Sequence, residues 1–582
     1  MIILLFLTLF NIQETNPGFL YLEAQKFLEE GNLKKTEQLL NKALKQNPDS
    51  VFLKLELVKV ILYQNQFSKA LKLLKSFNPS EDLMQDYYSL KFYLDLMLED
   101  LNGALEDHKF IKDVELTREN LNFIVEAIQN NFLRYLSEED PKNAIKLLKI
   151  YLEYFPMEKK IQKALLNLYI EAGNFEDAND LIKNIELDES ISPLIVDYLY
   201  YLFEKNDCKN ILKLKEKFKD SNSQEILMVY PYCFLREGNL EETISTIEKI
   251  LRINPKNELV LNLLFEIKLI EGDYSKAREI LELFPKENEK QLNSIRISEA
   301  FYYQIQGEYK LAEEIYLKLL DKFESKERIN ILRKLYNFYK DIGDCKKTLE
   351  YSLKIQEEDK DDIFSYFDIG EAYLISNDIE NGLFFLNLYN EFARTESLVD
   401  SIWLLLEYGY LNHAYDLIKK LENQKKDIVQ IKQLWGFYFF KKGEIDQMEK
   451  ILREDLDDAA SLNLLGYFLI EKDKKLDEAI SFLEKALKLQ PYNGSYLDSL
   501  GWGYYKKGEY KKAYEILKRA IFLEPFNGII LSHIGDVCLK LEKYDEALLR
   551  YRQALSFQEP EIPNVLEKMK EVLSFIYKKM LK

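Results

Sequence analysis

The sequence predicts an all-α solenoid of about sixteen stacked helix pairs that form a right-handed superhelix. The first observation is composition, because the 582 residues include only 20 Gly and 13 Pro, while 47% are hydrophobic. Lys, Glu and Leu, which are good helix formers, are abundant. The second observation is a pattern of small, aromatic and aliphatic residues that recurs about every 34 residues. One such unit cannot bury its own apolar face, so consecutive units have to stack.

The pattern is clearest in residues 494–527. In chain order this unit carries Leu500, Gly501, Tyr504, Gly508, Tyr510, Ala513, Leu517, Ala520 and Pro525. The same classes of residue recur one period earlier, from Leu465 to Pro491, and one period later, from Ile534 to Ala554. This order of residues matches the tetratricopeptide repeat, so the chain resembles proteins of that class.

Small residues mark the places where the two helices of a unit are expected to touch. They are Gly466, Gly501 and Gly535 in the first helices and Ala479, Ala513 and Ala547 in the second helices. Such residues let two backbones approach closely, while bulky residues three or four positions away fill the space beside them. Gly508 stands where a first helix ends, and we expect a left-handed conformation there.

Weaker copies of the pattern extend back to residue 17. Unit starts are expected near residues 17, 51, 85, 125, 159, 192, 224, 258, 293, 329, 363, 395, 429, 459, 494 and 528. The unit near 192–222 is supported only by an aliphatic face. We therefore divide the chain into an apolar N-terminal segment (1–16), divergent repeats (17–458), three strong repeats (459–561) and a helix that caps the exposed end of the stack (562–582).

The first ten residues, Met1–Phe10, are apolar. A run of this length is too short to span a bilayer, which takes about 20 residues, but it matches the apolar core of a signal peptide. No Lys or Arg precedes the run, and no small-x-small cleavage site follows it. We expect an export signal and a periplasmic or envelope-associated location. The alternative is an uncleaved apolar end that packs on the first helix pair.

The balance of charge bears on the choice of partner. The sequence has 99 acidic and 80 basic residues, which gives a formal net charge of −19. A phosphate backbone is repelled by such a protein, so nucleic acid is not expected as a partner. Basic or amphipathic protein segments fit this charge better.

Residues that carry catalysis or bind metals are few and scattered. The histidines are His108, His413 and His533, and none belongs to an HExxH arrangement. The cysteines are Cys208, Cys233, Cys345 and Cys538; they show no CxxC spacing, and we expect core thiols rather than a disulfide scaffold or a zinc site. We expect no catalytic residue, cofactor, metal or small-molecule substrate, and a protein that is not an enzyme. A glycosyl-transfer enzyme would need an additional α/β domain, for which the repeats at residues 17–561 leave no room.

In similar arrays the inner face of the solenoid is lined by particular positions of each first helix. In the last three units these positions include Asn463, Tyr467, Asp498, Trp502, Tyr505 and Asp536, which form our candidate peptide-binding groove. The core positions of the second of these units are already filled, so Trp502 and Tyr505 are expected to be exposed, beside polar groups that hold a peptide backbone. The alternative is that both rings pack against a neighbouring first helix. The Lys/Asn set of the chaperone-tail clamp is not present at matching positions, so recognition of a terminal carboxylate is not expected.

The strong block contains the stretches LNLLGYFLIEKDKKLDEAISFLEKALKLQP and LDSLGWGYYKKGEYKKAYEILKRA. It resembles the C-terminal repeats of long tetratricopeptide proteins exported by Gram-negative bacteria, among them an outer-membrane lipoprotein adaptor of a carboxy-terminal-processing protease. The resemblance implies a scaffold or adaptor that binds a polypeptide in its concave groove at the cell envelope, with a protease or cell-wall enzyme as partner. No Cys lies near the N-terminal apolar run, so the resemblance does not extend to a lipid anchor. A cytoplasmic assembly or regulatory module of a larger complex is the alternative, and a homo-oligomer stays open.

Overall fold

The computed structural model describes residues 16–112, 114–137, 140–186, 191–392, 395–424, 429–557 and 564–580. These residues form helices and turns, and no strand occurs among them. The chain divides into two compact units, Met1–Tyr201 and Leu202–Lys582, which we describe separately. The apolar residues for which we expect an export signal lie outside the described part of the chain, apart from the last position of that segment, Asn16.

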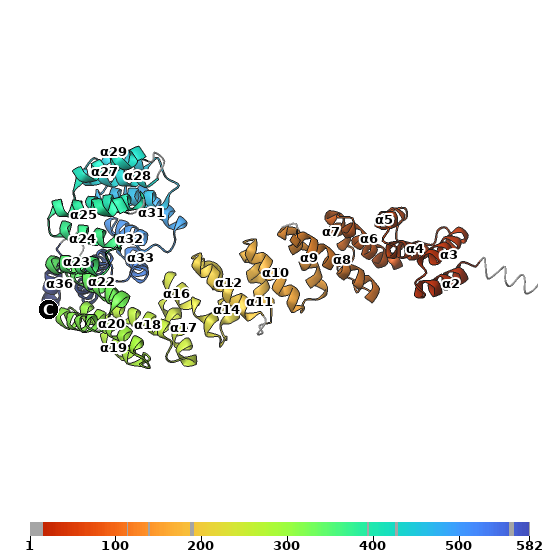
Figure 1. Ribbon diagram of the computed structural model, residues 1–582, viewed down its shortest axis with the longest axis horizontal. Helices are drawn as coiled ribbons and strands as arrows, with labels where there is room; N and C mark the ends of the chain where they lie inside the picture. The colour runs from red at the N-terminus through yellow and green to blue at the C-terminus, as the bar shows by residue number, and fades with distance from the viewer. Residues whose placement is uncertain are drawn as a thin grey trace, which may run out of the picture. The chain divides into compact units, whose positions relative to one another are not determined.

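Unit 1 is a row of antiparallel helix pairs, coloured from red to orange-yellow in Figure 1. Its first helices are α2 (Pro17–Glu29), α4 (Val51–Tyr63), α6 (Met84–Met97), α8 (Arg118–Ser137) and α10 (Lys159–Glu171). Each is followed by its second helix, α3 (Leu33–Gln46), α5 (Phe67–Leu74), α7 (Leu101–His108), α9 (Pro141–Tyr154) and α11 (Phe175–Asn184). A short 3-10 helix, η1 (Glu81–Leu83), precedes α6, and α12 (Ser192–Glu204) runs across the boundary between the units.

Unit 2 continues the same alternation. Its first helices are the pair α15 (Gln224–Leu227) and α16 (Val229–Arg236), then α18 (Glu258–Glu271), α20 (Glu289–Ile305), α22 (Ser325–Asp341), α24 (Ile363–Ile375), α26 (Thr395–Glu407), α28 (Val429–Lys442), α30 (Ala459–Glu471), α32 (Gly494–Lys506) and α34 (Gly528–Lys540). Its second helices are α13 (Cys208–Leu212) with α14 (Lys215–Phe218), α17 (Leu240–Ile253), α19 (Tyr274–Leu283), α21 (Tyr309–Leu320), α23 (Cys345–Glu358), α25 (Ile379–Phe392), α27 (Leu411–Gln424), α29 (Ile445–Leu452), α31 (Leu476–Leu489), α33 (Tyr510–Leu523) and α35 (Tyr544–Ala554). The last helix is α36 (Val565–Met580).

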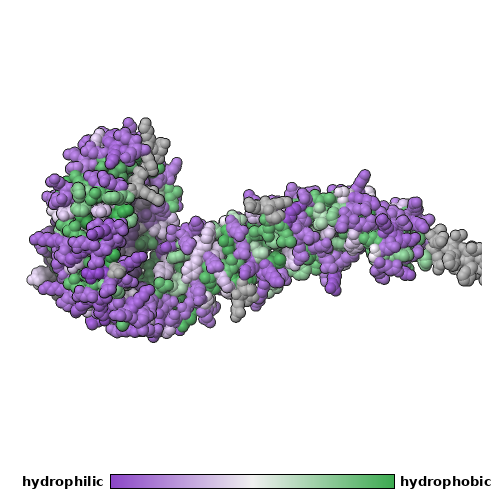
Figure 2. All heavy atoms as spheres, viewed as in Figure 1, coloured by the Kyte–Doolittle hydropathy of each residue, from purple (hydrophilic) through white to green (hydrophobic). Residues whose placement is uncertain are grey.

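The all-α solenoid of about sixteen pairs is confirmed among the described residues, and most first helices begin within a few residues of the expected starts. The largest departure is α8, which begins at Arg118 instead of near 125 and is 20 residues long. At the C-terminal end, α36 packs its apolar side on the preceding repeats, with Val565 and Val572 buried there. Figure 2 shows that hydrophilic residues cover most of the visible surface in both units, with smaller apolar patches between them.

Polar caps mark the starts of several first helices of unit 2. The side chains of Asn257, Asn493 and Asn527 each accept a hydrogen bond from the backbone N–H three residues later, at 3.3, 3.0 and 3.1 Å. Such bonds satisfy N–H groups that the start of a helix leaves free. At the other end of α32, Gly508 has φ +84°, the left-handed conformation expected there.

The two helices of a strong unit approach as closely as their small residues allow. A Cβ atom placed on Gly501 would lie 2.6 Å from Leu517 Cγ, and one on Gly466 would lie 2.7 Å from Leu483 Cγ. The same addition at Gly535 would meet the ring of Tyr551 at 2.6 Å. These contacts are shorter than carbon atoms tolerate, so a glycine at this position is required by packing between the helices.

The weak unit near 192–222 has a second helix that is broken into α13 and α14. The positions that hold Ala513 and Ala520 in the strong unit hold Ile211 and Phe218 here, and both side chains are buried. The small residues that allow close helix packing in the strong repeat are therefore absent here.

A disulfide joins this broken second helix to the first helix of the next repeat. Cys208 in α13 and Cys233 in α16 are both buried and bonded, with their Cα atoms 5.2 Å apart. The prediction of core thiols is therefore wrong for this pair. The two residues are 25 positions apart in sequence, but the second helix of one unit packs against the first helix of the next, which brings them together. Of the remaining cysteines, Cys538 is a buried free thiol and Cys345 is a half-buried one.

Side chains from the last two repeats bind the C-terminal ends of three first helices earlier in unit 2. Arg519 in α33 donates to the carbonyl of Arg236 at 3.2 Å, Arg550 in α35 donates to that of Ile270, and Ser556 donates to that of Gln304 at 3.0 Å. We call this set of contacts the seam. The three carbonyls belong to the ends of α16, α18 and α20 and lie 34 residues apart, which is one repeat. Figure 1 accordingly places α33 beside α16 and α18.

Candidate functional site

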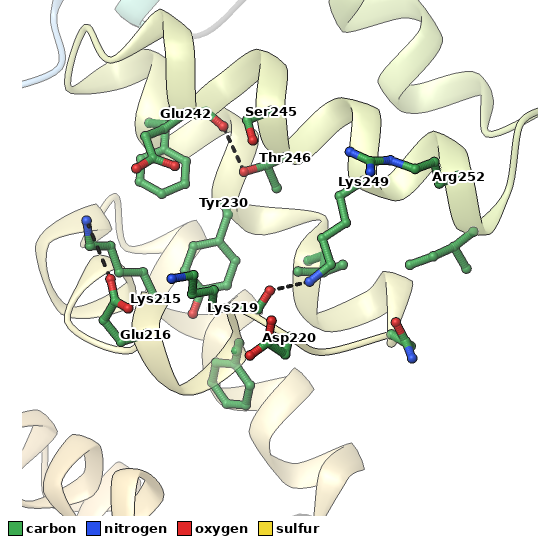
Figure 3. A pocket seen from close by; sticks show the side chains of 15 residues that line it. Lys215, Glu216, Lys219, Asp220, Tyr230, Glu242, Ser245, Thr246, Lys249 and Arg252 are labelled. Carbon is green, nitrogen blue, oxygen red and sulfur yellow. Dashed lines mark hydrogen bonds and ion pairs between the residues drawn. The ribbon is translucent and has the colours of Figure 1, made fainter.

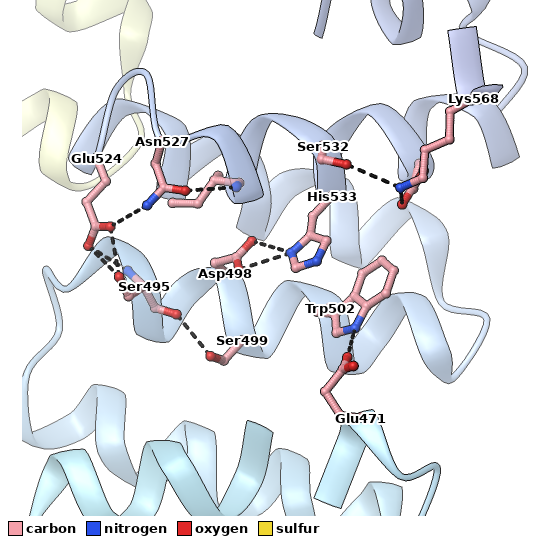
Figure 4. A network of polar contacts seen from close by, with 12 residues as sticks. Glu471, Ser495, Asp498, Ser499, Trp502, Glu524, Asn527, Ser532, His533 and Lys568 are labelled. Atoms are coloured by element: carbon pink, nitrogen blue, oxygen red, sulfur yellow. Dashed lines mark hydrogen bonds and ion pairs between the residues drawn. The ribbon is translucent and has the colours of Figure 1, made fainter. Parts of the chain in front are cut away.

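All six residues of the candidate groove lie on the first helices of the last three repeats. Asn463 and Tyr467 belong to α30, while α32 carries Asp498, Trp502 and Tyr505, and α34 carries Asp536. Figure 4 shows Asp498 and Trp502 among polar groups that come from neighbouring first helices and from α36. We refer to this side of α30, α32 and α34 as the first-helix face.

Three aromatic rings form a stack on the first-helix face. The Tyr505 and Trp502 rings are 4.6 Å apart and 7° from parallel, and the Trp502 and His533 rings are 4.1 Å apart and 11° from parallel. Trp502 also donates from Nε1 to Glu471 at the end of α30, at 2.6 Å (Figure 4). Of the two alternatives, packing against a neighbouring first helix applies to Trp502, which stacks on His533 of α34, and both Trp502 and Tyr505 are half-buried.

His533 is the member of the stack that the sequence analysis missed. Its Nδ1 lies 2.9 Å and 3.1 Å from the two carboxylate oxygens of Asp498 (Figure 4). Burial disfavours the charged imidazolium, but the Asp498 carboxylate more than offsets this, so the pKa of His533 is raised above its usual value. The signal that could have found this pair is its spacing of 35 residues, one repeat plus one position.

Asp536 is occupied by the protein itself. One of its carboxylate oxygens accepts from Tyr551 at 2.5 Å, and the other lies 2.7 Å from the ammonium group of Lys568 in α36. Its side chain is buried, so it holds α36 in place and offers no free oxygen to a partner. Asn463 differs, since its Oδ1 is buried with no hydrogen-bond partner among the described residues.

A second polar network joins α22 to α24. Lys340 lies 2.8 Å from a carboxylate oxygen of Glu371, and Tyr336 donates to the same group at 2.7 Å. Arg333 contacts Asp368 at 3.1 Å, yet burial raises the pKa of Asp368 to about 6. Ion pairs of this kind fix how neighbouring first helices sit against each other.

The broken second helix leaves a hollow of about 540 Å³ between α14, α16 and α17 (Figure 3). Lysines and carboxylates alternate around it, and much of their hydrogen bonding is internal. Lys249 donates to the carbonyl of Lys219, and Thr246 donates to that of Glu242 at 2.7 Å. Because its charges are mixed, the hollow favours no single class of ligand.

Within the described ranges, no group of three or more His, Cys, Asp or Glu side chains is arranged to hold a metal ion. None of the helices in that same part of the chain combines the length and the apolar character needed to cross a bilayer.

Comparison with known proteins finds two matches to short parts of the chain. Residues 472–554 match the family described as "Anaphase-promoting complex, cyclosome, subunit 3". A TPR repeat-containing protein of Pseudomonas aeruginosa is 39% identical over 77 residues, which cover 12% of this chain and 13% of that protein. The chain therefore spans about an eighth of the length of this curated relative.

Two solved structures are similar to the chain at low TM-scores. Naa15/Naa10 bound to HypK-THB is 13% identical, with 97% of each chain covered and a TM-score of 0.27. A thermophilic TPR protein of Thermus thermophilus is 19% identical over 31% of this chain and 100% of its own, with a TM-score of 0.28. At these scores neither likeness carries an argument about function.

The repeat pattern, the helix pairs and the close glycine contacts agree with the matches in residues 472–554. Stacked repeats of this kind present extended concave surfaces to their surroundings. On this evidence, the chain contains tetratricopeptide repeats.

Proposed function

We propose that this protein is a non-catalytic scaffold or adaptor that holds an extended polypeptide against the first-helix face of α30, α32 and α34. The observation that carries the proposal is the ring stack of Tyr505, Trp502 and His533, which Glu471 and Asp498 hold in place before any partner binds. A rigid aromatic surface loses little conformational entropy on binding, so more of its contact energy appears as affinity.

The polar groups beside the stack suit a peptide backbone. Asn463 has an amide oxygen without a partner among the described residues, and a small rotation of its side chain would offer that oxygen to a backbone N–H. Aromatic rings provide contact area while such groups fix the register of an extended chain.

We place this function at a bacterial cell envelope, with a protease or a cell-wall enzyme among the candidate partners. Three features support this location: the apolar run Met1–Phe10, the resemblance to exported adaptors, and the Cys208–Cys233 disulfide. Disulfides persist mainly in oxidising compartments outside the cytosol. A cytoplasmic assembly module of a larger complex is the second candidate.

Capture of a partner tests the proposed face. The full chain, the double variant Trp502→Ala/Tyr505→Ala and the control Phe384→Ala are immobilised and exposed to extracts of the source cells. Phe384 is an aromatic residue on the second helix α25 and is 57% exposed. We expect the control to retain the partner and the double variant to lose at least about tenfold in affinity, as aromatic hot spots do. Equal capture by all three proteins would remove the first-helix face from the proposal.

Location is tested separately. A C-terminal fusion to a reporter enzyme that folds only outside the inner membrane should be active in the source cell. Activity of a reporter that requires the cytosol would favour the assembly module instead.

A further inference from the structure

A second cavity lies where the seam brings α33 against α16 and α18. It has a volume of about 250 Å³. Its apolar walls come from Leu235 in α16, Leu263 and Ile267 in α18, and Phe522, Leu523 and Pro525 at the end of α33. We call it the seam pocket. An apolar cavity of about 150 Å³ already admits a benzene ring, so the seam pocket has room for one large side chain.

The seam determines the shape of this pocket. Arg519 is anchored to the carbonyl of Arg236, and Arg550 and Gln553 are anchored to carbonyls at the end of α18. These bonds set the spacing between α33 and the two first helices. The pocket is therefore formed by residues about eight repeats apart and exists only while the seam is closed.

Two opposite charges line the pocket without an ionic partner. The Glu266 side chain makes no ion pair or hydrogen bond with a described residue; part of it reaches solvent, while burial of its carboxyl group raises its pKa. Arg236 has no carboxylate partner among the described residues; its guanidinium lies 4.6 Å from the Phe203 ring and 5.9 Å from the Tyr492 ring. Its Nη1 lies 3.8 Å from Cys208 Sγ, which leaves the other N–H groups of the guanidinium without an acceptor in the described part of the chain, and burial lowers its pKa. A partly desolvated charge that lacks a partner gains from any ligand that supplies one.

We infer that the seam pocket binds one large apolar side chain of a polypeptide, with the Glu266 carboxylate accepting from the backbone N–H and the Arg236 guanidinium donating to the carbonyl. The apolar walls set the preference for the side chain. The two charges cancel, so together they match a neutral peptide unit; a terminal carboxylate in the same place would be attracted by Arg236 and repelled by Glu266. The inference rests on the proposed function, since it gives the bound polypeptide a second anchor, away from the ring stack.

Capped amino acids test the pocket directly. Binding of N-acetyl-phenylalanine amide, N-acetyl-alanine amide and N-acetyl-phenylalanine with a free carboxylate is measured on the full chain by ligand-observed NMR. We expect the phenylalanine amide to bind at least about tenfold more tightly than the alanine amide, because only the former fills the apolar walls. The free carboxylate, which Arg236 attracts and Glu266 repels, serves as the reference ligand for the charge variant below.

The variant Glu266→Gln keeps the shape of the side chain and removes its charge. It should weaken binding of the phenylalanine amide several-fold and shift the preference between the two ligands toward the free carboxylate. The matched control is Glu279→Gln, at an exposed position on the second helix of the same repeat. Circular dichroism confirms that both variants are folded.

Three results would overturn the inference: no binding of the phenylalanine amide, equal binding of the two amides, or unchanged binding in Glu266→Gln. The ring stack is a separate test. If the pocket binds the amide but Trp502→Ala/Tyr505→Ala captures the partner normally, the proposed face fails and the pocket stands. If the partner is lost by that variant and the amide does not bind, the pocket fails and the proposed function stands.

Discussion

His533 illustrates how one neighbour sets the charge of a buried side chain. Its imidazole stacks on Trp502 and contacts both carboxylate oxygens of Asp498. Because its pKa is raised in the folded protein, the charged pair stabilises the fold fully below the ordinary histidine pKa. That stabilisation is lost as the pH rises through the folded pKa.

The variant Asp498→Asn should lower the pKa of His533, because burial then acts without the carboxylate that offsets it. The pKa is measured from the imidazole C–H resonances in NMR titrations, with His533→Gln identifying the signal. The exposed Asp477→Asn serves as a control, since Asp477 pairs with Lys507 and is remote from the imidazole. An unchanged His533 pKa in Asp498→Asn would contradict this account.

A second residue-scale prediction concerns Asp107 in unit 1. Asp107 and Asp95 share one lysine, with Lys91 2.6 Å from the first carboxylate and 3.2 Å from the second. Burial raises the pKa of Asp107 to about 7, from an ordinary value of 3.8. The folded protein then binds a proton that the unfolded chain has released, so stability falls as the pH rises from about 4 to about 7.

Replacing Asp107 by Asn should remove this pH dependence and leave unit 1 more stable at pH 8, by no more than ~4 kcal/mol. The opening free energy of amides in α6 and α7 is measured by hydrogen exchange across the pH range, after correction for intrinsic rates. If the opening free energy changes with pH equally in the variant and the native chain, another group is responsible for the pH dependence.

At the scale of the element, the contact between the two helices of a unit decides which glycines can change. At Gly501 an added methyl group would improve helix propensity by about 1 kcal/mol but would overlap Leu517, and overpacking costs about 1–3 kcal/mol. The overlap is the larger effect, so Gly501→Ala should destabilise the protein by up to ~2 kcal/mol. Adding Leu517→Val should recover part of the loss. Additive effects in the double-mutant cycle would rule out the proposed contact.

The disulfide between α13 and α16 replaces packing that the broken helix cannot provide. Closing a loop of 25 residues stabilises a folded unit by roughly 3 kcal/mol in the chain-entropy picture. Reduction should therefore lower the melting temperature, and Cys208→Ser/Cys233→Ser should match the reduced protein and no longer respond to reductant.

Thiol labelling followed by mass spectrometry checks the same bond. The native chain should react slowly at the half-buried Cys345, and the unfolded, unreduced chain should react at Cys345 and Cys538. Cys208 and Cys233 should react only after the unfolded chain is reduced, so that all four cysteines are then labelled. Labelling of Cys208 without reductant would contradict the bond.

At the scale of the whole of unit 2, the seam adds contacts that a simple stack of repeats lacks. Arg550→Met keeps the length of a buried side chain but removes its bond to the Ile270 carbonyl, which should cost about 1–3 kcal/mol. Protection from hydrogen exchange should fall in α18 and α35 together. The control Arg552→Met, at an exposed position on the same helix, should change neither the stability nor the protection of α18 and α35. Loss of protection in α35 alone would indicate a local effect and no seam.

The repeat pattern predicts contacts within one repeat, but it does not predict contacts between repeats. Gly501 and Ala513 belong to one unit, so their contact follows from the repeat pattern, as do the helix starts. Trp502 lies on a first helix, as the repeat pattern predicts, but its burial depends on His533 one repeat later, which the pattern of a single repeat does not contain. Arg519 and Arg236 are 283 residues apart, and no periodicity specifies that they touch. The Cys208–Cys233 bond could not be predicted for a related reason, since it depends on packing between consecutive repeats.

The seam also has a consequence for how this array can evolve. In a linear stack, a repeat can be gained or lost and only its two neighbours need to adapt. Here the donors on α33 and α35 must arrive opposite the ends of α16 and α18, so the number of repeats between them is fixed. Inserting or deleting one 34-residue unit in that interval would leave each hairpin intact and shift every donor by a whole step. The length of this part of the chain is thus constrained by contacts that its local sequence never displays.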